Sequence, residues 1–398
     1  MAAESTAALG AARPPARILP VIVVSQFAGT SLWFAGNAVM ADLQRHSGLP
    51  EHALGDLTSA VQLGFIAGTL AFAFFAISDR YSPRRVFFLC SLLGAAANLS
   101  LYWSAADFGA LLGSRFVTGF FLAGIYPVGM KIAAGWYQKG LGNAIGWLVG
   151  ALVLGTAFPH GLRAAEHGWS WELVTWAVSA IAAAGGVLML LLVPDGPYLA
   201  KAARFDPRAL AVVFRSQEFR ASSFGYFGHM WELYAFWAFV PVVLAAHGSL
   251  EDGRSLSAWT FVVIAAGSLG CIAGGLVSLR AGSARVAYAQ LAASGACCVL
   301  SPLMFHAPAP LFLAFLVLWG IVVVGDSPQF SALNARWAPS TLVGSALTIA
   351  NCIGFAITIA TLQLLNRLSG HVDPAYLYLP LAAGPVFGLY ALRRLVRA

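Results

Sequence analysis

Five ionisable side chains stand out inside long apolar segments of this sequence, where charges are rare. Arg115 and Lys131 share one segment, His229 and Glu232 share a second, and Asp326 lies in a third. Placing a charge in such a segment costs several kcal/mol, so the side chain normally faces a polar cavity. These residues are therefore the first candidates for a functional site.

The two acidic residues are typical of groups that bind and release protons. Glu232 follows His229 by three positions, so both side chains lie on one face of a helix. A carboxylate in a dry cavity can exchange a proton near neutral pH, and a histidine can relay that proton or bind a ligand. Asp326 precedes Pro328, and a proline lets a helix bend beside a site. We predict that these acids and His229 carry protons, with Glu232 the main acid; the alternative is an inert His–Glu pair that ties helices together.

The two basic residues cannot hold the same small ligand. A rise of 1.5 Å per residue places Arg115 and Lys131 about 24 Å apart along one helix. We expect Arg115 to be the central cation and to serve both ligand binding and proton coupling. The alternative is a structural arginine bonded to neighbouring helices. Lys131 either takes part in function or extends its amine to the end of the helix.

Polar and aromatic side chains in the apolar segments could complete the site. An amide buried without a partner costs free energy, whereas packing alone can explain an aromatic ring. The predicted binding residues besides Arg115 and His229 are Trp33, Asn37, Gln62, Tyr126, Tyr226, Gln329 and Asn351, with Tyr234 and Asn334 also available. Neither a recognisable metal-ligand spacing nor a phosphate-binding glycine-rich loop occurs in the sequence. We therefore expect no metal, no cofactor and no use of ATP.

Composition places these residues in a membrane. The chain is 59% hydrophobic and 10% charged, whereas soluble domains have about 25% charged residues. A soluble fold could not bury so much apolar surface, so the partner is the lipid bilayer. The net charge of +7 comes from basic residues in short loops between apolar segments. That distribution favours membrane orientation over nucleic-acid binding.

The apolar segments predict an all-α membrane protein with twelve transmembrane helices. Each segment is close to the roughly 20 residues that a helix needs to cross the hydrocarbon. We expect a disordered tail at 1–17, a six-helix bundle at 18–194, a linker at 195–220 and a second six-helix bundle at 221–398. The predicted spans are 18–41, 55–77, 86–104, 109–134, 141–161, 171–193, 221–246, 256–279, 286–305, 309–335, 342–366 and 376–396.

An internal repeat supports the division into halves. Gly119 and Trp136 recur 201 positions later as Gly320 and Trp337, as do a second glycine, a proline and an alanine between them. An offset of half the chain length indicates two copies of one membrane module. Such an arrangement is typical of a two-halved transporter with its site between the halves.

Basic residues also predict the orientation. One set of loops and ends holds seventeen Lys and Arg residues, and the opposite set holds four, which are Arg45, Arg163, Arg254 and Arg367. The positive-inside rule then places both termini and the 195–220 linker in the cytoplasm. We expect a monomer in the cytoplasmic (inner) membrane of a bacterium.

The loop after the second apolar segment resembles the signature of the major facilitator superfamily. It reads SDRYSPRR at residues 78–85, and the second half repeats it in a diverged form at 275–285. In that family the loop locks the cytoplasmic helix ends through salt bridges. The resemblance implies this gating role for Asp79, Arg80, Arg84, Arg85, Arg280 and Arg285. Arg115 and Gly119 also resemble the family's intramembrane arginine signature, which is linked to proton coupling.

Two further segments, 225–237 and 326–333, resemble the branch of that superfamily loosely grouped with nitrate/nitrite porters. The leading hypothesis is a transporter, not an enzyme, that moves a small organic anion with protons by alternating access. The alternative is a proton-coupled exporter of a neutral or hydrophobic compound. A non-transporting receptor is disfavoured, because buried charges would then serve no purpose.

Overall fold

The computed structural model describes residues 14–50, 52–137, 140–165, 169–199, 205–250 and 252–397. Within these residues all regular structure is helical. Eleven helices in this part of the chain are long and apolar enough to cross a membrane, and Ile18–Thr30 is a shorter apolar helix. The predicted all-α membrane architecture is therefore confirmed.

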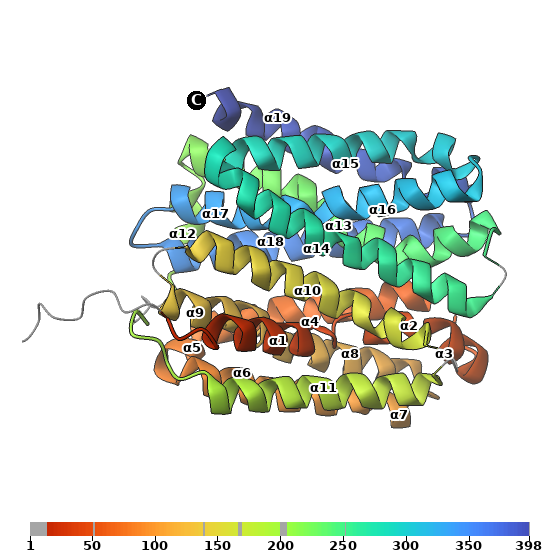
Figure 1. The fold of residues 1–398 in the computed structure, drawn as a ribbon, viewed down its shortest axis with the longest axis horizontal. Helices are drawn as coiled ribbons and strands as arrows, with labels where there is room; N and C mark the ends of the chain where they lie inside the picture. The colour runs from red at the N-terminus through yellow and green to blue at the C-terminus, as the bar shows by residue number, and fades with distance from the viewer. Residues whose placement is uncertain are drawn as a thin grey trace, which may run out of the picture.

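The N-terminal half forms one bundle, drawn from red to yellow-green in Figure 1. Its helices are α1 (Ile18–Thr30), α2 (Ala35–Ala38), α3 (Met40–Ser47), α4 (Ala53–Phe74), α5 (Ile77–Arg80), α6 (Pro83–Leu99), α7 (Leu101–Ser104), α8 (Phe108–Leu122), α9 (Tyr126–Trp136), α10 (Leu141–Arg163) and α11 (Trp171–Leu192).

The C-terminal half lies beside it and is drawn from green to blue. Its helices are α12 (Ala209–Val213), α13 (Gln217–His247), α14 (Gly253–Ala281), α15 (Ser283–Phe305), α16 (Ala309–Gly325), α17 (Ser327–Trp337), α18 (Val343–Leu368) and α19 (Ala383–Arg397), with short 3-10 turns η1 (Pro374–Tyr376) and η2 (Leu379–Ala382). Helix α1 begins and α19 ends at the same end of the bundle (Figure 1). We call this end the terminal end and the other end the opposite end.

The first predicted span is not one continuous helix, so that expectation is wrong. Helix α1 ends at Thr30, residues 31–34 form turns, and α2 and α3 follow. The freed carbonyl groups of Leu32 and Trp33 accept hydrogen bonds from the guanidinium of Arg115. A break inside a membrane is tolerated only where such a partner satisfies the backbone. The sequence pattern could not show this partner, because it lies 82 residues further along the chain.

The fourth and tenth predicted spans are broken as well. Helices α8 and α9 are separated by residues 123–125, and α16 and α17 meet at Asp326. The second break lies beside Pro328, where the sequence predicts a bend. The repeated segments therefore share a break at the same place in each half.

The repeated glycines mark a close crossing of helices in each half. A Cβ atom at Gly119 of α8 would lie 2.0 Å from the carbonyl oxygen of Val61 in α4. In the second half, a Cβ at Gly320 of α16 would lie 2.0 Å from the carbonyl oxygen of Val263 in α14. Only a residue without a side chain fits at such a crossing. The internal repeat thus encodes the same helix contact twice.

Replacing Gly119 with alanine should destabilise the N-terminal half. The added methyl group forces the two backbones apart, which we expect to lower the free energy of unfolding by about 1–3 kcal/mol. A titration with sodium dodecyl sulfate, followed by tryptophan fluorescence, measures this change. Gly113→Ala is the control, because a Cβ at Gly113 on the same helix meets no atom within 4 Å. That control should be neutral or stabilising, by up to about 1 kcal/mol; equal effects of the two variants would contradict the crossing.

The two halves pack against each other mainly through two pairs of helices. Helix α10 runs along α14, and α4 runs along α18. On α10, Gly146 and Gly150 face α14, and Cβ atoms there would lie 3.6 Å from the Cys271 carbonyl oxygen and 3.5 Å from Ile272. The interface between these pairs is the place where a solute could cross.

The predicted linker is attached to both halves. At its start, the backbone N–H of Tyr198 donates to the carbonyl of Gly135 in α9 over 2.9 Å. Further along, the backbone N–H of Asp206 donates to the hydroxyl of Ser345 in α18 over 3.1 Å. Helix α13 begins at Gln217, before the linker's predicted end.

Candidate functional site

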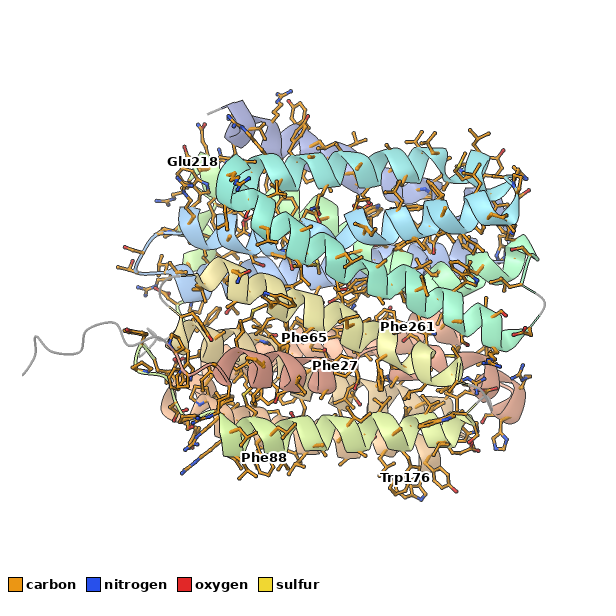
Figure 2. All side chains as sticks on the ribbon, in the orientation of Figure 1. Phe27, Phe65, Phe88, Trp176, Glu218 and Phe261 are labelled. Carbon is orange, nitrogen blue, oxygen red and sulfur yellow. The ribbon has the colours of Figure 1, made fainter. Side chains whose placement is uncertain are left out.

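Aromatic rings from both halves meet at the interface, from the turn after α1 and from helices α4, α13 and α18. We call this group the interface cluster: Trp33, Phe34 and Phe65 from the N-terminal half, and Tyr234, Trp237 and Phe355 from the C-terminal half. The centroids of Phe65 and Phe355 are 4.4 Å apart, and the ring of Trp33 stacks on that of Phe355 at 5.7 Å. Figure 2 shows Phe65 near the middle of the bundle. A solute that passes between the halves must part these rings.

Two predicted binding residues are bonded within the N-terminal half, and one of them, Gln62, contacts the interface cluster. Gln62 accepts a hydrogen bond from the indole N–H of Trp33 over 3.3 Å, and the side chain of Asn37 donates to the hydroxyl of Thr58 over 2.8 Å. Gln62 is fully buried, and its Nε2 has no hydrogen-bond partner among the described residues. The same holds for the indole nitrogen of Trp237, which sequence reasoning did not select.

Arg115 is bonded within the N-terminal half. Its Nη1 donates to the side-chain oxygen of Asn98 over 3.0 Å, and its Nη2 donates to the carbonyls of Leu32 and Trp33 over 3.0 and 2.6 Å. The side chain is 1% exposed. These contacts match the structural alternative for this residue and place it directly behind Trp33. Sequence reasoning missed Asn98, although an asparagine inside an apolar segment signals a bonded amide.

Asp326 and His229 form a buried pair in the C-terminal half. The Nδ1 atom of His229 lies 2.8 Å from Oδ1 of Asp326, and both side chains are at most 1% exposed. Oδ2 of Asp326 and Nε2 of His229 have no hydrogen-bond partner among the described residues. The rings of Tyr226 and Phe330 lie about 6 Å from the histidine, at 6.1 and 5.9 Å between centroids. The break between α16 and α17 thus presents a carboxylate to α13.

Glu232 lies one helical turn further along α13 and is fully buried. Its Oε2 accepts from the hydroxyl of Ser294 over 2.7 Å and from the thiol of Cys298 over 3.4 Å. The indole N–H of Trp319 donates in turn to the Ser294 hydroxyl over 3.0 Å. Oε1 has no partner among the described residues. A dry carboxylate with hydroxyl partners but no bonded cation can exchange a proton.

The two halves differ in the charge that they bury. In the N-terminal half, the Leu32 carbonyl and the Asn98 side chain accept hydrogen bonds from Arg115. In the C-terminal half, Glu232 accepts from Ser294 and Cys298. The N-terminal half therefore buries a permanent cation, and the C-terminal half buries a titratable acid.

The other predicted binding residues divide between these places. Tyr126 lies 6.4 Å from the ring of Trp33, beside the interface cluster. Tyr226 packs against Gly354 and the Asp326–His229 pair, and Gln329 is 3% exposed one turn after Asp326. Asn351 is half-buried on α18, one turn before Phe355. Asn334 instead accepts hydrogen bonds from Ser222 and Ser223 inside the C-terminal half.

At the terminal end, the predicted gating loop is bonded to Lys131. That lysine forms an ion pair with Asp79, and its amine also donates to the carbonyl of Ser78 over 2.7 Å. The family resemblance implied arginine partners for Asp79, so Lys131 is an addition to the predicted set. Arg84 donates to the carbonyl of Leu190 over 3.3 Å. The remaining predicted gating residues are exposed: Arg80, Arg85, Arg280 and Arg285.

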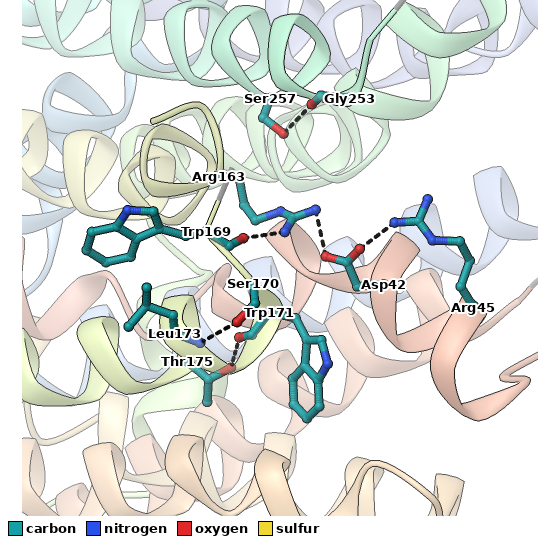
Figure 3. Close-up of polar contacts among 10 residues, drawn as sticks. All are labelled: Asp42, Arg45, Arg163, Trp169, Ser170, Trp171, Leu173, Thr175, Gly253 and Ser257. Atoms are coloured by element: carbon teal, nitrogen blue, oxygen red, sulfur yellow. Dashed lines mark hydrogen bonds and ion pairs between the residues drawn. The ribbon is translucent and has the colours of Figure 1, made fainter. Parts of the chain in front are cut away.

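At the opposite end, ion pairs brace the N-terminal half. Figure 3 shows the Asp42 carboxylate between the guanidinium groups of Arg45 and Arg163. Nη2 of Arg163 contacts Asp42, and Nη1 donates to the carbonyl of Trp169. The contact between Arg163 and Asp42 is 2.6 Å long. These bonds tie α3 to the end of α10 and so hold the segment that follows the break in the first span.

Hydrogen bonds join the two halves at this same opposite end. The amide of Gln363 in α18 donates to Asp56 and Ser59 of α4, each over 3.0 Å. Asn366 donates to the carbonyl of His52 over 2.8 Å. Arg254 of α14 donates to the carbonyl of Ala164, after α10, over 3.1 Å. Among the described residues, every hydrogen bond between the N-terminal and C-terminal bundles lies at this end, so the halves are closed at the end away from the termini.

Comparisons with known proteins agree with this architecture. A family model described as Major Facilitator Superfamily matches residues 21–361. The structure is similar to a crystal structure of the human organic anion transporter MFSD10 (TETRAN), with a TM-score of 0.72, 14% identity, and coverage of 96% of this chain and 100% of that one. It is also similar to a mutant of the nucleoside transporter NupG, with a TM-score of 0.70, 14% identity, and coverage of 94% and 99%. Among curated protein sequences none matches. The chain therefore belongs to the Major Facilitator Superfamily of membrane transporters.

Proposed function

We propose that this transporter moves a small organic solute by alternating access and couples the movement to protons at Glu232 and the Asp326–His229 pair. The observation that carries the proposal is that both carboxylates are fully buried and contact no Lys or Arg among the described residues. Glu232 belongs to α13 and Asp326 contacts α13 through His229, and the same helix bears Tyr234 and Trp237 of the interface cluster. A change of charge beside α13 therefore acts on the helix that touches the other half.

The same proposal includes an orientation. With both termini in the cytoplasm of a bacterial cell, the opposite end of the bundle faces outward. The bonds of Gln363 to α4 and of Asn366 to His52, the residue before α4, would then close the outer side. Asp79 and Lys131, with the arginines of the loops, would close the cytoplasmic side in the alternate state. The protein would act as a monomer in the inner membrane.

Two solute classes are candidates. A small organic anion is supported by Arg115, which lies behind Trp33, and by the similarity to a structure described as an organic anion transporter. The relation to nitrate/nitrite porters remains a prediction from 225–237 and 326–333. A neutral or hydrophobic compound is supported by a more direct observation: the interface is lined by aromatic rings, while the bonds of Arg115 stay within the N-terminal half.

Solute-driven proton movement tests the function. Purified protein is reconstituted in vesicles that contain a pH-sensitive dye, and solutes are added outside in the absence of a pH gradient. A transported solute should change the internal pH, with inward acidification for symport and alkalinisation for exchange. Accumulation of a solute without any proton movement would contradict the coupling proposal. The dye response of protein-free vesicles is subtracted, because weak acids and bases cross lipid unaided in their neutral forms and then change the internal pH.

A further inference from the structure

We propose that the interface cluster binds a neutral aromatic molecule that carries two hydrogen-bond acceptors, one for Gln62 Nε2 and one for Trp237 Nε1. The inference rests on the proposed function, since it names the solute class of the same interface. It adds Trp237, from the C-terminal half, to the binding residues expected from the sequence.

The two donors are available and come from different halves. Both side chains are fully buried, and neither nitrogen has a hydrogen-bond partner among the described residues. The amide oxygen of Gln62 is used by the indole N–H of Trp33, so the amide offers its N–H groups to a ligand. The indole of Trp237 can only donate. The missing partners must therefore be acceptors.

The rings around these donors favour a flat, apolar ligand. Trp237 contacts Phe34 edge-on at 6.2 Å and Tyr234 at 5.4 Å, and Trp33 stacks on Phe355. The cluster joins the halves, so its rings separate when the interface opens. A planar ring system can replace the ring contacts that are then lost.

The charges around the cluster favour a neutral ligand. The guanidinium of Arg115 is held by Asn98 and by the carbonyls of Leu32 and Trp33. The acids Glu232 and Asp326 bond to residues inside the C-terminal half. A buried ionic ligand would need a charged partner within the cluster itself, and the cluster's six side chains are all uncharged aromatics.

Binding of matched probes to the purified full-length protein tests the inference. The probes are caffeine, which is neutral and flat with acceptors but no donors; naphthalene, which has no acceptors; and 2-naphthoate, which is an anion. Equilibrium dialysis without any ion gradient measures affinity. Caffeine should bind about a hundredfold more tightly than naphthalene, because each satisfied buried donor is worth about tenfold. Equal affinities, tighter binding of 2-naphthoate, or no caffeine binding at millimolar concentration would overturn the proposal.

Trp237→Phe removes the N–H and keeps a ring. It should weaken caffeine binding about tenfold and leave naphthalene binding unchanged, which also shows that the variant is folded. Trp103→Phe is the matched control, because Trp103 is 70% exposed and lies outside the cluster. An equal loss for caffeine and naphthalene would assign Trp237 a packing role and overturn its role as donor. The dialysis uses no gradient, so its outcome is independent of the vesicle experiment. Selective binding of caffeine without solute-driven proton movement would refute only the proton coupling. Solute-driven proton movement without selective binding of caffeine would refute only the solute class.

Discussion

Glu232→Gln should abolish proton-driven accumulation of the solute while sparing exchange of solute between the two faces. Glutamine keeps the size of the side chain and can still accept from Ser294, but it cannot gain or lose a proton. Net accumulation requires that proton, whereas exchange returns the carrier in the loaded state and requires no net proton movement. Uptake into vesicles with an imposed pH gradient, compared with exchange at equal pH, separates the two activities.

The same helix offers a matched control for this substitution. Glu218 is exposed near the start of α13, and Figure 2 shows it at the terminal end of the bundle. Glu218→Gln removes the same chemical group outside the buried site and should leave both activities unchanged. If Glu232→Gln accumulates solute fully, the role moves to Asp326. Asp326→Asn, which also alters the contact with His229, then decides whether any buried acid is coupled.

Much of the fold follows from the sequence because it depends on local composition and on the repeat. Apolar length places the spans, and the bend at Asp326 follows from Pro328. The glycines at an offset of 201 mark the crossings at Val61 and Val263. Each of these features depends on residues close in sequence or on a pattern present twice.

Contacts between segments that are distant in the sequence cannot be predicted from local composition or from the repeat. The break after Thr30 depends on a guanidinium from α8, and an apolar segment gives no sign that a distant cation will hold its carbonyls. The closure by Gln363 at the opposite end was also missed. Polar residues near the ends of apolar spans resemble ordinary surface residues until the two halves are docked.

The position of Arg115 bears on how much of its importance is structural. An intramembrane arginine suggests a ligand or a proton path, and both remain proposals here. The structure adds a structural role. The side-chain oxygen of Asn98 and the carbonyls of Leu32 and Trp33 all accept hydrogen bonds from this one guanidinium. A substitution that only removed ligand binding would leave those acceptors satisfied. Stability and transport must therefore be measured together.

Arg115→Ala should lower the free energy of unfolding by on the order of 4 kcal/mol, from lost charge-assisted hydrogen bonds and the void left behind. Transport should be lost with it. Arg115→Lys keeps the charge, but one ammonium lacks the planar fork that reaches Asn98 and both carbonyls, so its stability should be intermediate. Titration with sodium dodecyl sulfate measures stability, and vesicle uptake measures transport.

Arg45→Ala is the control, since that side chain is 73% exposed and a surface ion pair contributes at most about 1 kcal/mol. Wild-type stability in Arg115→Ala would refute the structural role, and a stable but inactive Arg115→Lys would favour a direct part in solute or proton binding.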